Sequence, residues 1–202
     1  MVNGQQIQTD ALAVAEELRL ALTRSQLTQT AFAAALGTSQ PRLSTYLSSK
    51  VSPSAEFFVR AQRLGQALEG LRCLHLLSAP TLGLALRTTL NDGDRGWAFR
   101  LLMQGRDHLR LVLDSHPDLI AGWLATPLST GLEEWDTLTA VVAGHEFSSA
   151  GLDAPPWTQR KALATPWVVA SRLLAPQEVR AATPTWLAAL NIFVPERDLA
   201  TV

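Results

Sequence analysis

The sequence predicts an all-α protein, and three observations favour that class. In the first 70 residues the apolar side chains recur at three- and four-residue spacing in short blocks. Serine, threonine or aspartate precedes each block, where it can cap a helix. Helical spacing continues over residues 97–113 and 134–149. We therefore expect a flexible tail at residues 1–9, a compact domain of four or five helices at residues 10–70, and a mainly helical domain at residues 71–202.

The first expected helix runs from residue 10 to residue 25. Asp10 is its predicted N-cap, because residues 1–8 are mostly polar and contain a glycine. We expect the apolar face of this helix to pack into the core of the N-terminal domain. That face carries Leu12, Ala15, Leu18, Ala21 and Leu22.

Two shorter helices are expected next, over residues 29–36 and 40–48. Thr28 and Ser39 are their predicted N-caps. Gly37 lies between them and is expected to take a positive φ angle, which a tight turn between two helices requires.

A last N-terminal helix is expected to begin after Ser52, with Pro53 at its first position, and to stop at Gly70. Gly65 lies in its middle and is a point at which the segment can divide, giving five helices instead of four. Its apolar residues at helical spacing are Phe57, Phe58, Ala61, Leu64 and Leu68.

Residues 28–48 have the pattern of a helix-turn-helix. Ala33 is small enough to let two helices cross closely, and Gly37 supplies the turn. The residues expected to face inward are Phe32, Leu36, Leu43 and Leu47. The outward residues of the second helix are polar and rich in donors: Gln40, Arg42, Ser44 and Thr45. Such a face can enter the major groove of DNA, while N–H groups at the two helix N-termini can meet phosphates.

The bulk composition restricts the function further. The 202 residues carry 17 Lys and Arg against 18 Asp and Glu, for a net charge of −1. This balance excludes a protein that coats nucleic acid without specificity, so a few placed contacts, doubled by dimerisation, must bind any DNA. No stretch reads as a membrane span or a signal peptide, so we expect a soluble cytoplasmic protein without membrane partners. The single cysteine, Cys73, excludes an internal disulfide, and its apolar neighbours predict that it is buried on a helix.

The sequence shows no catalytic or metal-binding constellation, so we expect no enzyme activity, no cofactor and no metal. The histidines are scattered, and none pairs with another at metal-ligand spacing. His145 and Glu146 resemble the start of a metalloprotease helix, but Ser149 stands where the second histidine belongs. We therefore interpret His145 as a helix residue beside the core. Residues 93–96 are predicted to form a turn before a helix rather than a phosphate loop.

All six tryptophans and nine of the 11 prolines follow residue 70. The prolines after Gly151 exclude a long helix there, because each removes a backbone donor. Residues 192–194 are a candidate short strand. The tryptophans have two interpretations: they fill a small C-terminal core, or some of them line a groove for a partner protein or a small effector.

Residues 10–69 resemble the Cro-like, or XRE, helix-turn-helix family of phage repressors and bacterial regulators. The resemblance rests on the segment LTQTAFAAALGTSQPRLSTYLSSKVSP, whose small, glycine and leucine positions are in the family's register and whose proline precedes the next helix. It implies a sequence-specific transcriptional regulator, and a repressor rather than an activator. Such a protein binds a near-palindromic operator in double-stranded DNA as a homodimer.

The resemblance also implies roles for single residues. Gln29 opens the first motif helix and would touch a phosphate and brace Gln40. Gln40, Pro41 and Thr45 take the base-facing positions of the recognition helix. Pro41 departs from the family pattern, because it replaces a polar base reader with a side chain that offers only apolar contact, as with a thymine methyl group.

The remaining residues of the expected site flank these positions. Arg42 and Ser44 would reach a base or the DNA backbone, and Lys50 would contact a phosphate after the helix. The complete set of expected DNA-binding residues is Gln29, Ser39, Gln40, Pro41, Arg42, Ser44, Thr45 and Lys50.

The C-terminal part has a second resemblance. Its segments WDTLTAVVAGHEFSSAGLDAPPWT and NIFVPERDLATV are similar to regions of XRE-type antitoxins encoded beside nucleotidyltransferase-like toxins. This implies an autorepressing antitoxin that holds a cognate toxin through residues after Gly70. The alternative from another class is a protein-interaction adaptor whose helix-turn-helix no longer binds DNA. The adaptor predicts no salt-dependent affinity for any duplex.

Overall fold

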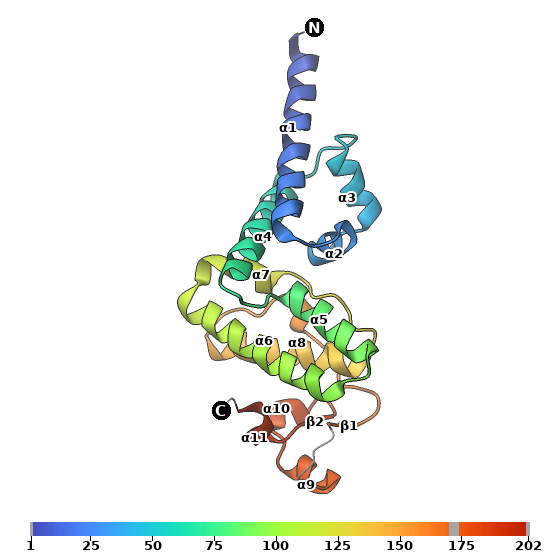
Figure 1. The fold of residues 1–202 in the computed structure, drawn as a ribbon, viewed down its shortest axis with the longest axis vertical. Coiled ribbons are helices and arrows are strands. Elements are labelled where there is room, and N and C mark those ends of the chain that lie inside the picture. Colours follow the sequence, from blue (N-terminus) through green and yellow to red (C-terminus); the bar gives the residue numbers. More distant parts are fainter. Residues whose placement is uncertain (1, 170–173, 201–202) are drawn as a thin grey trace. The chain divides into compact units, whose positions relative to one another are not determined.

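The structure is a computed structural model that describes residues 2–169 and 174–200 (Figure 1). Its regular structure is almost entirely helical, so the predicted all-α class is confirmed. Two short strands, β1 (Trp167–Val168) and β2 (Ile192–Phe193), pair in parallel with Trp167 opposite Ile192. The expected strand near residue 192 is therefore present. Within the described residues no helix is both long enough and apolar enough to cross a membrane.

The chain divides into two compact units. The first comprises the chain up to Gly83 together with Leu111–Leu128, and the second comprises Leu84–Arg110 together with the chain from Ser129 onward. The expected boundary at residue 70 differs from this division. The physical reason lies in the packing of 111–128 on the last N-terminal helix: a Cβ added to Gly70 would lie 2.6 Å from a methyl carbon of Leu119.

Helix α1 (Val2–Ser25) begins earlier than the sequence predicts. Residues 2–9 are helical, so the flexible tail expected there and the N-cap expected at Asp10 are wrong; Met1 lies outside the described residues. Residues 2–9 contain no proline, and their one glycine costs a helix only about 1 kcal/mol. Ala15, Leu18 and Ala21 are buried as predicted, but Leu12 is 53% exposed.

Helices α2 (Gln29–Ala35), α3 (Gln40–Leu47) and α4 (Ala55–Cys73) complete the N-terminal bundle. Helix α4 differs from its prediction at both ends. Ser54 caps it in place of Ser52, since its hydroxyl accepts a hydrogen bond from the Phe57 N–H at 3.2 Å. The helix continues past Gly70, and Cys73 in its last turn is exposed rather than buried.

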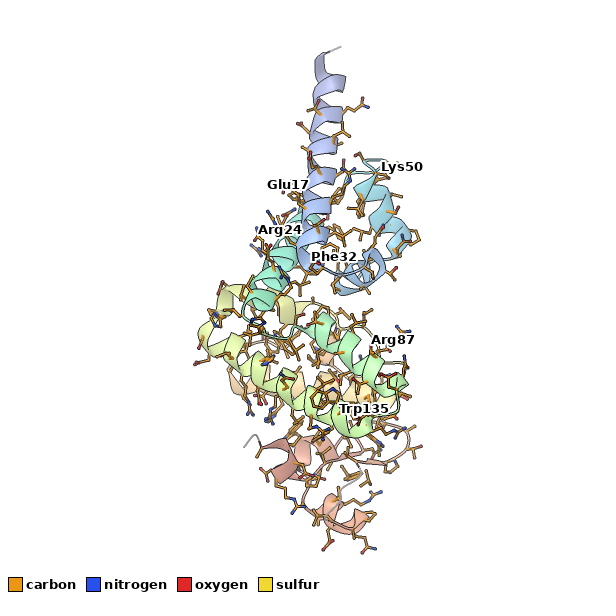
Figure 2. The ribbon with its side chains drawn as sticks, in the orientation of Figure 1. Glu17, Arg24, Phe32, Lys50, Arg87 and Trp135 are labelled. Carbon is orange, nitrogen blue, oxygen red and sulfur yellow. The ribbon has the colours of Figure 1, made fainter. Side chains whose placement is uncertain are left out.

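The core of the first unit lies between these four helices, which Figure 1 shows in blue to green. Gly65 does not divide α4; it lets α1 approach, because a Cβ there would lie 2.7 Å from the carbonyl oxygen of Ala21. Phe32 of α2 is fully buried in this core (Figure 2). The buried residues of the cluster include Leu18, Ala21, Phe32, Ala33, Leu36, Leu43, Tyr46, Phe57, Ala61, Leu64 and Leu68.

The rest of the chain is helical but increasingly broken. Gly93 has a positive φ angle and the Asp94 side chain accepts from the Trp97 N–H, so the turn predicted at residues 93–96 is confirmed. No described helix after Gly151 is longer than the six residues of α9, as the prolines predicted. The elements are α5 (Ala79–Asn91), α6 (Arg95–Ser115), η1 (Pro117–Leu119), α7 (Ala121–Leu124), α8 (Glu133–Ser149), η2 (Pro156–Thr158), α9 (Pro176–Ala181), α10 (Thr185–Ala188) and α11 (Glu196–Leu199).

The tryptophans differ in burial, and Trp167 and Trp186 are half-buried. Trp123, Trp135 and Trp157 are buried, which fits the interpretation that they fill cores. Trp135 also packs against Trp167, with ring centroids 5.4 Å apart. Trp97 is 46% exposed and lies beneath the guanidinium of Arg100, so it belongs to the surface.

Candidate nucleic-acid interface

The turn between α2 and α3 is built on Gly37. Its φ angle is +68°, as predicted. The N–H of Gly37 donates to the Ala34 carbonyl and the N–H of Thr38 to the Ala33 carbonyl, both at 2.9 Å. These two bonds form a Schellman motif, which ends α2 and frees the chain to start α3 two residues later.

The start of α3 is fixed by Ser39, whose hydroxyl accepts a hydrogen bond from the Arg42 N–H at 3.4 Å. Thr28 caps α2 in the same way through the Ala31 N–H at 3.2 Å, so both predicted N-caps are confirmed. Pro41 lies in the first turn of α3 and has no N–H. Of the first three residues of α3, Gln40 alone therefore keeps a backbone N–H that no other described group uses.

The outward face of α3 is polar, as the sequence predicted. Pro41, Arg42 and Ser44 are exposed, whereas Gln40 and Thr45 are half-buried. The Thr45 hydroxyl donates to the Arg42 carbonyl at 2.7 Å, so it keeps only acceptor capacity and its methyl group for an outside partner. Leu43 is fully buried and anchors the opposite face of the helix.

Arg42 is held in place by Tyr46, one turn further along α3. The Arg42 Nε donates to the Tyr46 hydroxyl at 2.7 Å, and the guanidinium carbon lies 5.9 Å from the centre of the ring. The ring of Tyr46 packs in turn against Phe57 of α4, with centroids 5.1 Å apart. Sequence reasoning missed Tyr46; its spacing of four residues from Arg42 was the available signal.

The end of α3 is fixed from outside the motif. Arg19 of α1 donates from Nη2 to the carbonyl of Leu47, which satisfies one of the open carbonyl groups of the last turn. Sequence reasoning missed this contact as well. Its partners are 28 residues apart, so no local pattern indicates it.

A second Schellman motif follows α3 and orients Lys50. Ser49 takes a φ angle of +59°, and the Lys50 N–H donates to the Thr45 carbonyl at 3.0 Å. Lys50 is exposed in the loop beyond the helix (Figure 2). The Ser49 hydroxyl is buried without a partner among the described residues, so this turn carries both backbone strain and an unsatisfied polar atom.

The two glutamines expected to cooperate are both half-buried. Within the described residues their side chains make no hydrogen bond to each other, so the brace between Gln29 and Gln40 is absent here. Both amides remain available to another partner.

The electrostatics of this region are uniform. Residues 26–54 contain no aspartate or glutamate but carry Arg42 and Lys50. No side chain of this segment can therefore repel a phosphate or neutralise either cation. A surface of this kind suits a polyanion.

The second unit contains a different concentration of charge. A cavity of about 430 Å³ is lined by residues that include Arg106, Arg110, His145, Glu146 and Trp186. Buried Glu146 accepts a two-pronged ion pair from Arg110, at 2.6 and 2.9 Å. The hydrogen bonds to Glu146, only partly offset by burial, raise the pKa of Arg110 further above its ordinary value. Arg110 and Glu146 therefore neutralise each other, and Arg106 is paired with Asp107 at 2.7 Å.

His145 does not lie beside the core as expected. Its ring is exposed and stacks on the ring of Trp186, with centroids 4.2 Å apart and planes 4° apart. The side chain at i+1, Glu146, takes the buried position instead. Across the part of the chain that the structure describes, no three His, Cys, Asp or Glu side chains gather as a metal site.

Comparison with protein families, with curated proteins and with solved structures finds no match to this chain.

Proposed function

We propose that this protein is a sequence-specific DNA-binding regulator that inserts α3 into the major groove. The observation that carries the proposal is the outward face of α3, which is polar, free of carboxylates and bounded by two cations. An α-helix fits the major groove, and its first turn is the part nearest the base edges.

The contacts around α3 support the proposal because they make the face rigid. Ser39 fixes the first turn, Arg19 the last turn and Leu43 the buried side. A rigid reading surface loses little conformational entropy on binding, and this favours specific contacts over adaptable ones.

The proposal includes repression from a near-palindromic operator by a homodimer. A helix of eight residues reads only a few base pairs, so a pair of copies is needed for useful specificity. Two such helices bind half-sites about 34–36 Å apart, or a multiple of that distance. In the antitoxin version, the tryptophan-rich second unit also holds a toxin encoded by a neighbouring gene.

The test is to incubate the purified full-length protein with fragmented genomic DNA and to sequence the fragments that it retains. We expect a few strong inverted-repeat sites, including one upstream of the protein's own gene. Affinity for those sites should fall steeply with salt concentration, since bound cations displace counterions from DNA.

The matched control is the double variant Gln40→Ala/Thr45→Ala, which removes two reading side chains and no charge. Its affinity for the selected sites should fall by about 10- to 100-fold. If the variant and the natural protein retain the same fragments to the same extent, α3 does not read DNA. The adaptor alternative then stands, and the search moves to protein partners of the second unit.

A further inference from the structure

We infer that Arg42 is the guanine-reading residue of α3 and that Tyr46 holds it in the reading geometry. The inference rests on the proposed function and identifies one base pair of the operator. Each half-site contains a G·C pair opposite the first turn of α3. The family resemblance places Arg42 beside the base-facing positions, where it would reach a base or the DNA backbone, and names no base for it.

Arg42 keeps most of its hydrogen-bond donors for a partner outside the helix. A guanidinium carries five N–H donors, and here Nε spends its one donor on the Tyr46 hydroxyl at 2.7 Å. The four donors on Nη1 and Nη2 have no partner among the described residues. These two terminal groups form the fork that matches the O6 and N7 acceptors of guanine in the major groove.

Arg42 also keeps its charge for such a partner. Arg24, Arg106 and Arg110 each lie within ion-pair distance of a carboxylate. Arg42 is held instead by a neutral phenol, so its full positive charge remains. An arginine that is already oriented and not neutralised is suited to a negatively polarised acceptor pair.

The brace that Tyr46 provides is rigid. Tyr46 is 6% exposed and its ring packs on Phe57 at 5.1 Å, so the hydroxyl is a fixed point rather than a mobile one. An exposed arginine ordinarily loses much side-chain freedom on binding. Because Tyr46 already restricts Arg42 in the free protein, part of this loss of side-chain freedom occurs on folding and not on DNA binding.

The neighbouring residues make Arg42 the best guanine reader on this face. Pro41 has no polar group, and the Thr45 hydroxyl has already spent its donor within the helix. Lys50 offers a point charge instead of a planar fork. Gln40 has the amide that pairs with adenine rather than guanine.

The experiment selects binding sequences from duplexes with a randomised stretch of about 30 base pairs, three turns of DNA. The full-length protein, Arg42→Gln and Arg63→Gln are compared. Arg63 is an exposed α4 residue, so its variant removes the same charge away from α3. We expect the natural protein and Arg63→Gln to select a motif with one strongly preferred G per half-site, and Arg42→Gln to lose that preference alone.

A second measurement replaces the selected guanine by 7-deazaguanine, which lacks the N7 acceptor. The natural protein should lose affinity by about 10-fold, and Arg42→Gln should lose almost none. Tyr46→Phe keeps the buried ring and removes only the hydroxyl. It should melt within about 2 °C of the natural protein and yet discriminate several-fold less between guanine and 7-deazaguanine.

The outcomes separate the two claims. If the natural protein enriches no sequence, both the proposed function and this inference fail. If it enriches a motif whose preferences Arg42→Gln leaves unchanged, DNA binding stands and the role of Arg42 is overturned. If Arg42→Gln loses the preferred G but Tyr46→Phe discriminates as well as the natural protein, Arg42 reads the base without help and the brace is overturned.

Discussion

Two arginines, Arg110 in the second unit and Arg42 in the first, are held in opposite ways. In the second unit, Arg110 pairs with buried Glu146 through two short hydrogen bonds, and Arg106 lies 2.7 Å from Asp107. In the first unit, Arg42 stands in a segment without any carboxylate and is held by a phenol. A guanidinium paired with a carboxylate contributes to the internal structure, whereas one positioned by a neutral group keeps its charge for a partner. Of these two arginines, Arg42 is therefore the one whose charge remains for an anion.

The largest expected effect is a loss of stability when the ion pair of Arg110 is broken. Glu146→Gln removes the charge that accepts both hydrogen bonds of Arg110, and we expect it to lower the free energy of unfolding by about 1–2 kcal/mol. Arg110 is 52% exposed, so water compensates part of the loss. Urea unfolding monitored by tryptophan fluorescence measures the change.

Arg42→Gln is the counterpart in the first unit. It should lower the free energy of unfolding by less than about 1 kcal/mol, since it breaks the hydrogen bond of an exposed side chain to Tyr46 but no charge pair. A loss as large as that of Glu146→Gln would show that Arg42 is structural and would remove the contrast between the units.

The second comparison concerns two glycines with positive φ angles, one in each unit. Gly37 has φ +68° and Gly151 has φ +72°, and a Cβ added to either would meet no atom of residues 2–169 or 174–200 within 4 Å. Alanine at either position should therefore cost about 1 kcal/mol from backbone strain alone. Only Gly37→Ala should also weaken DNA binding, which a gel-shift titration of both variants measures. Equal losses of DNA affinity would contradict the assignment of α3.

A smaller effect of opposite sign is expected at Ser49. Its φ angle of +59° is strained for a residue with a side chain, and its buried hydroxyl has no partner in the part of the chain that the structure describes. Ser49→Gly should raise the free energy of unfolding by about 0.5–1 kcal/mol without moving Lys50. Asn191 in the second unit has a similar φ angle, but its Nδ2 donates to the Leu163 carbonyl at 2.7 Å. Asn191→Gly should therefore bring a smaller gain or a loss, and thermal melting of both variants tests the difference.

The smallest expected effect is a dependence on pH in the second unit. Burial lowers the pKa of His108, and the charge of Asp107 opposes this only in part. The unfolded chain therefore takes up its proton first on acidification, so the stability that this histidine contributes is present above about pH 6.5 and is lost as pH falls below it. Urea midpoints at about pH 7.5 and about pH 5.5 should differ more for the natural protein than for His108→Gln. An identical difference would contradict the assigned cause.

The sequence by itself determined the local features of this protein. The helix caps at Thr28 and Ser39 and the turn at Gly37 were predicted correctly because each depends on atoms within five residues of one another. The helical class followed from apolar spacing, and the short C-terminal helices followed from proline, whose effect is confined to one turn. Even so, local rules placed the start of α1 wrongly, because Asp10 is a good cap only where the preceding chain leaves the helix.

Tertiary structure alone decided the long-range contacts around the candidate site and in the cavity of the second unit. The contact of Arg19 with Leu47, the packing of Tyr46 on Phe57 and the pairing of Arg110 with Glu146 join residues that are 28, 11 and 36 positions apart. Each pair forms only after whole helices have packed, and the sequence pattern of either partner is unchanged whether or not the other is near. For the same reason periodicity did not reveal that residues 111–128 complete the first unit. Local chemistry thus determined where α2 and α3 begin and where the chain turns between them. Long-range packing determined which polar groups pair inside the protein and which stay available to a partner.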